Sequence, residues 1–136
     1  MESRTIAENT LKSKGMILTR SRVDIYDHIL RTRSHPTCEE IYDSIKGQNG
    51  KLSIATVYNV TEKLVEEKLL VKLIAPNGEM RFDATLSFHG HFYCEHCGRI
   101  FDFDCEADKL AQGLDGFEIR EFEVKATGLC PECRNL

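Results

Sequence analysis

Two cysteine pairs in the C-terminal third constrain this chain more than any other feature of its sequence. Cys94 and Cys97 form one Cys-X-X-Cys pair, and Cys130 and Cys133 form another. Zinc prefers four thiolate ligands at the corners of a tetrahedron, and two such turns brought together supply them. Because four thiolates leave no open position for water, the pattern predicts a structural zinc site. Zinc binding would then help to stabilise a domain whose own apolar core is small.

The alternatives for these cysteines are a redox-active dithiol or unrelated free thiols. A dithiol oxidoreductase needs a βαβ context and a reactive thiol at a helix N-terminus, whereas the first pair here follows a predicted strand and opens a turn. The N-terminal segment lacks the apolar stretch of a secretion signal, so we expect a cytoplasmic protein, in which disulfides are rare. Of the other two cysteines, we expect Cys38 in the core and Cys105 free.

Charge is distributed unevenly along the 136 residues, whose net charge is −4. Residues 1–84 carry 13 Lys and Arg against 12 Asp and Glu, whereas residues 85–136 carry 5 against 10. A nucleic-acid partner is therefore plausible for the front half and not for the back half, which indicates two domains of different chemistry. No apolar run approaches the roughly 20 residues of a membrane-spanning helix, so we expect no membrane partner.

The front half has the pattern of a winged helix. Apolar periodicity predicts helices over residues 3–14 and after the N-caps Thr19, Thr37 and Ser53, of which Thr37 begins a capping box with Glu40. In the fourth helix the expected inward residues are Ile54, Val57, Val60, Leu64 and Val65. Two short apolar runs around Pro76-Asn77-Gly78 predict a β-hairpin. Helices followed by a hairpin are the order of a winged helix-turn-helix domain.

The remainder of the chain predicts a small α/β domain. Strands are expected at 91–94, 99–103 and 117–126, with one brief helix containing Ala107, Leu110, Ala111 and Leu114. A change of alternation phase along the last strand predicts a β-bulge near Arg120. The fold class is therefore α+β, with a winged helix-turn-helix domain followed by a small α/β domain that contains the zinc site.

Histidines and aspartates form a second, less specific constellation. His89 and His91 lie directly before the first cysteine pair, and Asp83, Asp102 and the distant His35 complete a set of nitrogen and oxygen donors. Such donors suit iron(II), manganese(II) or zinc(II). Spacing alone leaves open the alternative that these are ordinary surface residues.

Three motifs together give the chain a resemblance to a known family. The string Ser53-Ile54-Ala55-Thr56-Val57-Tyr58, the His-X-His followed by Cys-X-X-Cys-Gly, and the closing Cys-Pro-Glu-Cys resemble those of the ferric uptake regulator family of metal-dependent bacterial repressors. The resemblance covers essentially the whole chain. It implies a winged-helix DNA-binding domain over residues 1–84, a hinge at about 80–88, and a dimerisation domain over residues 89–136.

The resemblance also implies roles for particular residues and the partners of the protein. Structural zinc would be held by Cys94, Cys97, Cys130 and Cys133, and regulatory iron(II) or manganese(II) by His35, Asp83, His89, His91 and Asp102. DNA contacts would come from Lys14, Arg22, Ser53, Ala55, Thr56, Tyr58 and Asn59. A homodimer with two winged helices would read an inverted-repeat operator in double-stranded DNA.

The pair of aspartates bears on which branch of the family this chain resembles. Asp83 and Asp102 match the set of the peroxide-sensing repressors, in which iron-catalysed oxidation of histidine ligands is the signal. Phe88 and Gly90 stand where many iron regulators have a His and an acid of a further metal site. The alternatives are an iron, manganese or zinc uptake regulator, a zinc-ribbon interaction module and, more remotely, a zinc-dependent enzyme. Peroxide is the one small molecule expected to act on the protein.

Overall fold

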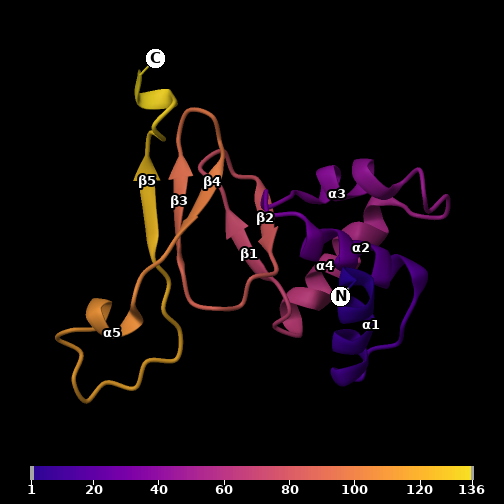
Figure 1. The fold of residues 1–136 in the computed structure, drawn as a ribbon, viewed down its shortest axis with the longest axis horizontal. Helices are drawn as coiled ribbons and strands as arrows, with labels where there is room; N and C mark the ends of the chain where they lie inside the picture. Colours follow the sequence, from indigo (N-terminus) through magenta and orange to yellow (C-terminus); the bar gives the residue numbers. More distant parts are fainter. Residues whose placement is uncertain (1, 136) are drawn as a thin grey trace. The chain divides into compact units, whose positions relative to one another are not determined.

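The computed structural model describes residues 2–135, which form two compact units (Figure 1). The first unit comprises the chain up to Ile74 together with Glu79–Leu86, and the second comprises Ala75–Gly78 together with the chain from Ser87 onward. Within the described residues, no helix has the length and apolar character needed to cross a bilayer.

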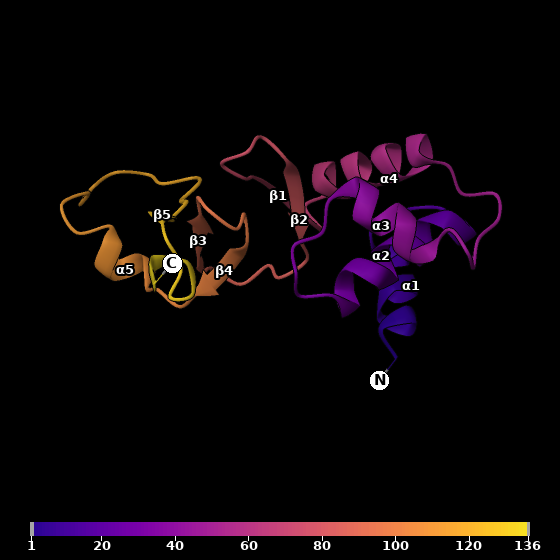
Figure 2. The same cartoon turned by 90° about the horizontal axis from the view of Figure 1, so that it is seen from above.

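The first unit contains four helices and a two-stranded sheet. The helices are α1 (Ser3–Ser13), α2 (Arg20–Arg31), α3 (Cys38–Ile45) and α4 (Ile54–Glu66), and the strands are β1 (Val71–Ile74) and β2 (Met80–Asp83). Helices α2, α3 and α4 pack against one another, and α1 packs on α2. Figure 2 shows α4 along one side of this unit, with the hairpin at its C-terminal end.

The predicted N-caps begin the helices as expected. The Thr19 side chain accepts a hydrogen bond from the backbone N–H of Arg22, and Ser53 accepts one from Thr56. Thr37 and Glu40 form the full capping box, each side chain accepting from the other's backbone N–H. These bonds satisfy donors that a helix N-terminus otherwise leaves without partners.

The core of the first unit joins all four helices to the hairpin. Its fully buried members include Leu11 of α1, Ile25 and Ile29 of α2, Ile41 of α3 and Leu64 of α4. Cys38 is also buried, as predicted.

The predicted inward face of α4 is only partly correct. Val57, Val60 and Leu64 are buried, but Ile54 is 38% exposed and Val65 is half-buried. Ile54 is the first residue of the helix, and the buried stripe begins one turn later at Val57.

The hairpin has the predicted turn and a regular register. β1 and β2 are antiparallel and pair Val71 with Asp83 at one end and Ile74 with Met80 at the other. In the turn between them, Gly78 has a φ of 88°, a conformation that glycine adopts at little cost. The backbone N–H of Phe82 donates to the carbonyl of Pro36, which ties β2 to the segment before α3.

The second unit is a three-stranded sheet with the order β4-β3-β5. Its elements are β3 (Gly90–Cys94), β4 (Ile100–Phe103), α5 (Ala107–Leu110), β5 (Lys125–Gly128) and a 3-10 turn at Cys133–Asn135. β4 runs antiparallel to β3, whereas β5 runs parallel to it. Both neighbours therefore place their residues beside the His91–Cys94 segment, where the metal-ligand candidates lie.

Two sequence predictions for the second unit are wrong in extent. The last strand begins only at Lys125, where it meets His91 of β3, so the predicted strand over 117–124 and the bulge near Arg120 are absent. β3 starts at Gly90, and the N–H of His91 donates to the carbonyl of Val124, so residues before about 124 have no part of β3 beside them. The predicted helix over 107–114 ends after one turn at Leu110; Gly113, at φ 95°, lies in the loop that follows.

Candidate metal sites and nucleic-acid interface

The structure brings the four predicted zinc ligands together. The Sγ atoms of Cys94, Cys97, Cys130 and Cys133 all lie within 4.8 Å of one another. The Sγ atoms of Cys97 and Cys130, one from each pair, are 3.9 Å apart. A tetrahedral zinc ion with bonds of about 2.3 Å separates its sulfurs by about 3.8 Å, so the cluster has the dimensions of a zinc site.

The two cysteine pairs are closed by equivalent backbone turns. The N–H of Gly98 donates to the carbonyl of Cys94, and the N–H of Arg134 donates to the carbonyl of Cys130. Gly98 has a φ of 76°, which explains a glycine directly after the first pair. Three of the four cysteines are buried, and Phe92 and Phe101 pack against them, whereas Cys97 is exposed.

Backbone N–H donors favour the thiolate form of Cys94, one of the four cysteines of the cluster. The N–H groups of Cys97 and Cys130 both donate to the sulfur of Cys94, at 3.5 Å each. These bonds favour the thiolate and lower the pKa of Cys94 to about 5. All six cysteines of the chain are free thiols, and the four-thiolate set matches a closed structural zinc site.

The histidine and aspartate candidates form two groups, one in each unit. In the first unit, His35 Nε2 lies 3.6 Å from Asp83 Oδ2, and both side chains are buried. Two contacts hold this pair: Arg81 donates to the His35 carbonyl at 3.0 Å, and the Thr85 N–H donates to Asp83 Oδ1 at 2.9 Å. His35 has a φ of 57°, an uncommon backbone conformation directly before a proline.

In the second unit, two imidazoles face one carboxylate. His91 and Asp102 are register partners on β3 and β4. His89 Nε2 and His91 Nε2 both lie 3.4 Å from Asp102 Oδ1. His89 Nδ1 is 2.7 Å from the Ser87 carbonyl, which only an N–H can satisfy, so Nε2 carries the lone pair in the neutral ring. A lone pair facing a carboxylate oxygen is stabilised by a cation, and this donor set fits iron(II) or manganese(II).

Gly90, between these two histidines, lies directly beneath the Phe103 ring, so a larger residue there would require that ring to move. A Cβ at this position would lie 2.4 Å from the ring of Phe103 on the paired strand. The glycine therefore reflects close packing of β3 against β4.

The predicted DNA-contacting residues of α4 share an exposed face. Ala55 and Asn59 are exposed, Tyr58 is 38% exposed, and Thr56 is half-buried. The hydroxyls of Ser53 and Thr56 lie 2.9 Å apart, and Ser53 also caps the helix, so both take part in the helix N-terminus.

The remaining DNA candidates lie at the end of α1 and in the first turn of α2. Lys14 is exposed beyond the end of α1. The Arg22 guanidinium donates to the carbonyl of Ile17 at 2.6 Å, so this side chain fixes the loop between α1 and α2.

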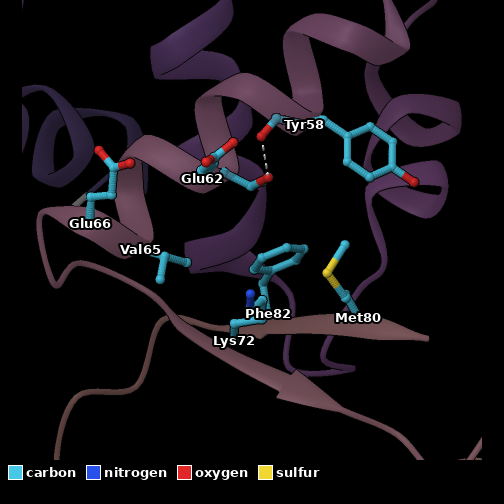
Figure 3. A pocket seen from close by; sticks show the side chains of 8 residues that line it. Tyr58, Glu62, Val65, Glu66, Lys72, Met80 and Phe82 are labelled. Carbon is cyan, nitrogen blue, oxygen red and sulfur yellow. Dashed lines mark hydrogen bonds between the residues drawn. The ribbon is translucent and has the colours of Figure 1, made fainter. Parts of the chain in front are cut away.

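A cavity of about 440 Å³ lies between α4 and the hairpin. Figure 3 shows the side chains that line it. Its lining residues are Tyr58, Thr61, Glu62, Val65, Glu66, Lys72, Met80 and Phe82. The Thr61 hydroxyl donates hydrogen bonds to the backbone carbonyls of Val57 and Tyr58. The lining contains neither His nor Cys, so it offers no metal site of the kinds described above.

Two contacts were not expected from the sequence. The Tyr58 hydroxyl donates to the Glu39 carboxylate of α3, and the Arg99 guanidinium contacts the sulfurs of Cys97 and Cys130. Tyr58 and Glu39 are nineteen residues apart, and no local pattern relates them. For Arg99, its position two residues after Cys97 was the available signal.

Comparison with known proteins agrees with this arrangement. The model of the ferric uptake regulator family matches residues 13–127. The peroxide operon regulator of Bacillus subtilis is 34% identical over 131 residues, covering 93% of this chain and 90% of that protein. The structure of the Helicobacter pylori ferric uptake regulator superposes with a TM-score of 0.79 at 23% identity, covering 97% and 91% of the two chains. The structure of the peroxide-sensing regulator PerR from Streptococcus pyogenes superposes with a TM-score of 0.57 at 28% identity, covering 98% of this chain and 94% of that chain.

Proteins of the matched family are DNA-binding dimers that regulate transcription, and they are not enzymes. The first unit has the helices and hairpin of a winged helix-turn-helix domain, and the second contains the four-cysteine cluster. The chain belongs to the ferric uptake regulator family.

Proposed function

We propose that this protein is a cytoplasmic, peroxide-sensing repressor. The observation that carries the proposal is the pair of aspartates, Asp83 beside His35 and Asp102 beside His89 and His91. The 34% identity to a peroxide operon regulator over 93% of the chain supports the same branch.

Regulation follows if one cation takes ligands from both groups. His35 and Asp83 belong to the DNA-binding domain, residues 1–84, and His89, His91 and Asp102 to the dimerisation domain, residues 89–136. A cation shared by all five would favour one arrangement of the domains about a hinge at 80–88. Because binding free energies are linked, the arrangement that binds DNA would also bind the metal more tightly.

Dimerisation is assigned to the second unit. Large apolar side chains are exposed at Leu110, Leu114, Phe117, Ile119 and Leu129, and Phe117 is 67% exposed. Apolar surface of this kind is typical of a face that a second copy covers. Zinc held by Cys94, Cys97, Cys130 and Cys133 would keep this unit folded.

The two DNA-binding domains of such a dimer would read an inverted-repeat operator. We expect Tyr58 and Asn59, on the exposed face of α4, to lie near the bases, together with Ala55 and Thr56. We expect Lys14, Arg22 and Ser53 to lie near phosphates.

Peroxide would act on the histidine ligands. If iron(II) were held by His35, Asp83, His89, His91 and Asp102, it would supply an electron for the reduction of peroxide beside these side chains. His35 and His89 are the imidazoles expected to gain an oxygen atom, which weakens their binding to metal. Because His35 is the histidine of this set that the DNA-binding domain contributes, its oxidation would uncouple the two domains.

Operator binding tests the proposal in four conditions: protein with iron(II) or with manganese(II), each before and after brief peroxide. A peroxide sensor binds with either metal and releases DNA after peroxide only in the iron form. An uptake regulator for iron, manganese or zinc would instead respond to metal identity or concentration and keep its DNA through brief peroxide.

A further inference from the structure

The side chain of Arg99, next to the cysteine cluster, is 51% exposed but makes several contacts with the cluster and its neighbours. Arg99 Nε lies 3.4 Å from Cys97 Sγ, and Arg99 Nη2 lies 3.8 Å from Cys130 Sγ. The same Nη2 donates to the Glu132 carboxylate at 2.8 Å. The guanidinium carbon is 5.2 Å from the centre of the Phe101 ring. A single guanidinium therefore joins a sulfur of each cysteine pair.

We propose that Arg99 is a positioning residue that protects the zinc thiolates from peroxide. Zinc with four thiolates carries a net charge of −2, and N–H donors aimed at the sulfurs draw electron density from them. Cys97 is the exposed cysteine of the cluster, so peroxide from solvent meets it first. Its sulfur is also the one to which Arg99 donates at the shorter distance.

The reaction that Arg99 opposes is the two-electron oxidation of Cys97. The thiolate sulfur attacks one oxygen of hydrogen peroxide, the O–O bond breaks, and hydroxide leaves. The sulfur becomes a sulfenic acid: RS⁻ + H₂O₂ → RSOH + OH⁻. A neighbouring thiolate can then attack that sulfur, forming a disulfide and releasing a second hydroxide, and zinc loses two ligands. A lone pair engaged by an N–H donor is less available for the first attack.

Arginine suits this place because its planar fork donates in several directions at once. A lysine at position 99 would keep the charge but could not hold the same fixed geometry on two sulfurs and a carboxylate. Glu132 keeps the guanidinium over the cluster, so its removal should weaken the protection without abolishing it.

The test measures zinc release from iron-free, zinc-loaded protein with a chromogenic zinc chelator, with and without hydrogen peroxide. Arg99→Gln should release zinc about tenfold faster than the parent under peroxide, the effect of losing about one charge-assisted hydrogen bond. Arg99→Lys and Glu132→Gln should fall between the two. Arg120→Gln is the matched control. It removes an exposed arginine that pairs with Glu118, outside the cysteine cluster, and should release zinc at the parent's rate.

A merely structural role predicts a different result. If Arg99 only holds the two turns together, Arg99→Gln would accelerate zinc loss to the chelator alone as much as it does under peroxide, and the proposal is overturned. It is also overturned if the variant and the parent release zinc equally under peroxide. Should Arg99→Gln purify without zinc, the same comparison is made with Arg99→Lys. Peptide mass spectrometry should find Cys97 as the first oxidised cysteine of the four in the cluster. Because iron is absent throughout, failure here leaves the proposed function of the histidine site untouched.

Discussion

The phenol of Tyr58 donates a hydrogen bond to the carboxylate of Glu39, which joins the exposed face of α4 to the first turn of α3. Glu39 raises the pKa of Tyr58 to about 12, because ionising the phenol removes the donor and places a second negative charge beside the carboxylate. Tyr58 is therefore held in a fixed orientation at neutral pH, on the surface where we place base contacts.

Replacing Glu39 should be visible in the titration of this tyrosine. The pKa of Tyr58 is higher in the folded state than in the unfolded state, where it is about 10. The hydrogen bond therefore stabilises the folded state fully below pH 10, and this stabilisation is lost as the pH rises toward 12. In Glu39→Gln the Tyr58 pKa should fall toward about 10. Tyrosinate absorbance would measure this, with Tyr58→Phe to identify the residue and Asp43→Asn as the control on α3. An unchanged titration in Glu39→Gln would show that the carboxylate does not hold the phenol in solution.

Tyr58 should affect the sequence specificity of DNA binding more than its overall affinity. A base contact carries sequence information, whereas a phosphate contact does not. Tyr58→Ala should therefore reduce the ratio of operator to random-sequence binding while leaving random-sequence binding nearly unchanged. Competition binding with both DNAs measures this ratio. If Tyr58→Ala has the same ratio as the parent, Tyr58 does not contact the bases.

Arg22 should behave in the opposite way. Its guanidinium bonds to the Ile17 carbonyl and orders the loop before α2, where we place a phosphate. Arg22→Gln should weaken binding to all sequences and reduce the slope of log affinity against log salt by about 1. The control is Arg31→Gln, an exposed arginine at the far end of α2. If the two variants have equal salt slopes, Arg22 does not contact a phosphate.

The zinc cluster predicts a sharp difference between two cysteines. Cys97→Ser removes one of four thiolates and should release zinc and unfold or monomerise the second unit, because metal binding contributes to its folding. Cys105→Ser, outside the cluster, should keep zinc and remain a dimer. Metal analysis and light scattering compare the two. A folded, zinc-loaded Cys97→Ser dimer would contradict a structural role for the cluster.

The sequence predicted correctly those elements that are stabilised by contacts between residues close together in the chain. The caps Thr19, Thr37 and Ser53 act on backbone groups within three residues, and the hairpin depends on its Asn77-Gly78 turn, so the sequence was sufficient for both. The paired cysteines were predictable for the same reason, because zinc chemistry fixes their spacing.

Elements that depend on distant partners were predicted less well. The strand expected over 117–126 needed to pair with β3, and only its last residues meet that strand. Glu39 and Arg99 were missed because their roles arise from three-dimensional neighbours: Tyr58 lies on another helix, and Cys130 lies 31 residues along the chain. Charge and polarity alone do not mark such residues.

Oxidation of the histidines by peroxide tests the central claim most directly. Iron-loaded and manganese-loaded protein would be exposed briefly to peroxide, and peptides containing His35 and His89 examined by mass spectrometry beside an operator-binding assay. We predict one added oxygen on these histidines and loss of operator binding in the iron form only, with the zinc cysteines unmodified. Oxidation confined to cysteine, or equal histidine oxidation in both metal forms, would contradict a peroxide sensor and favour a metal-uptake regulator.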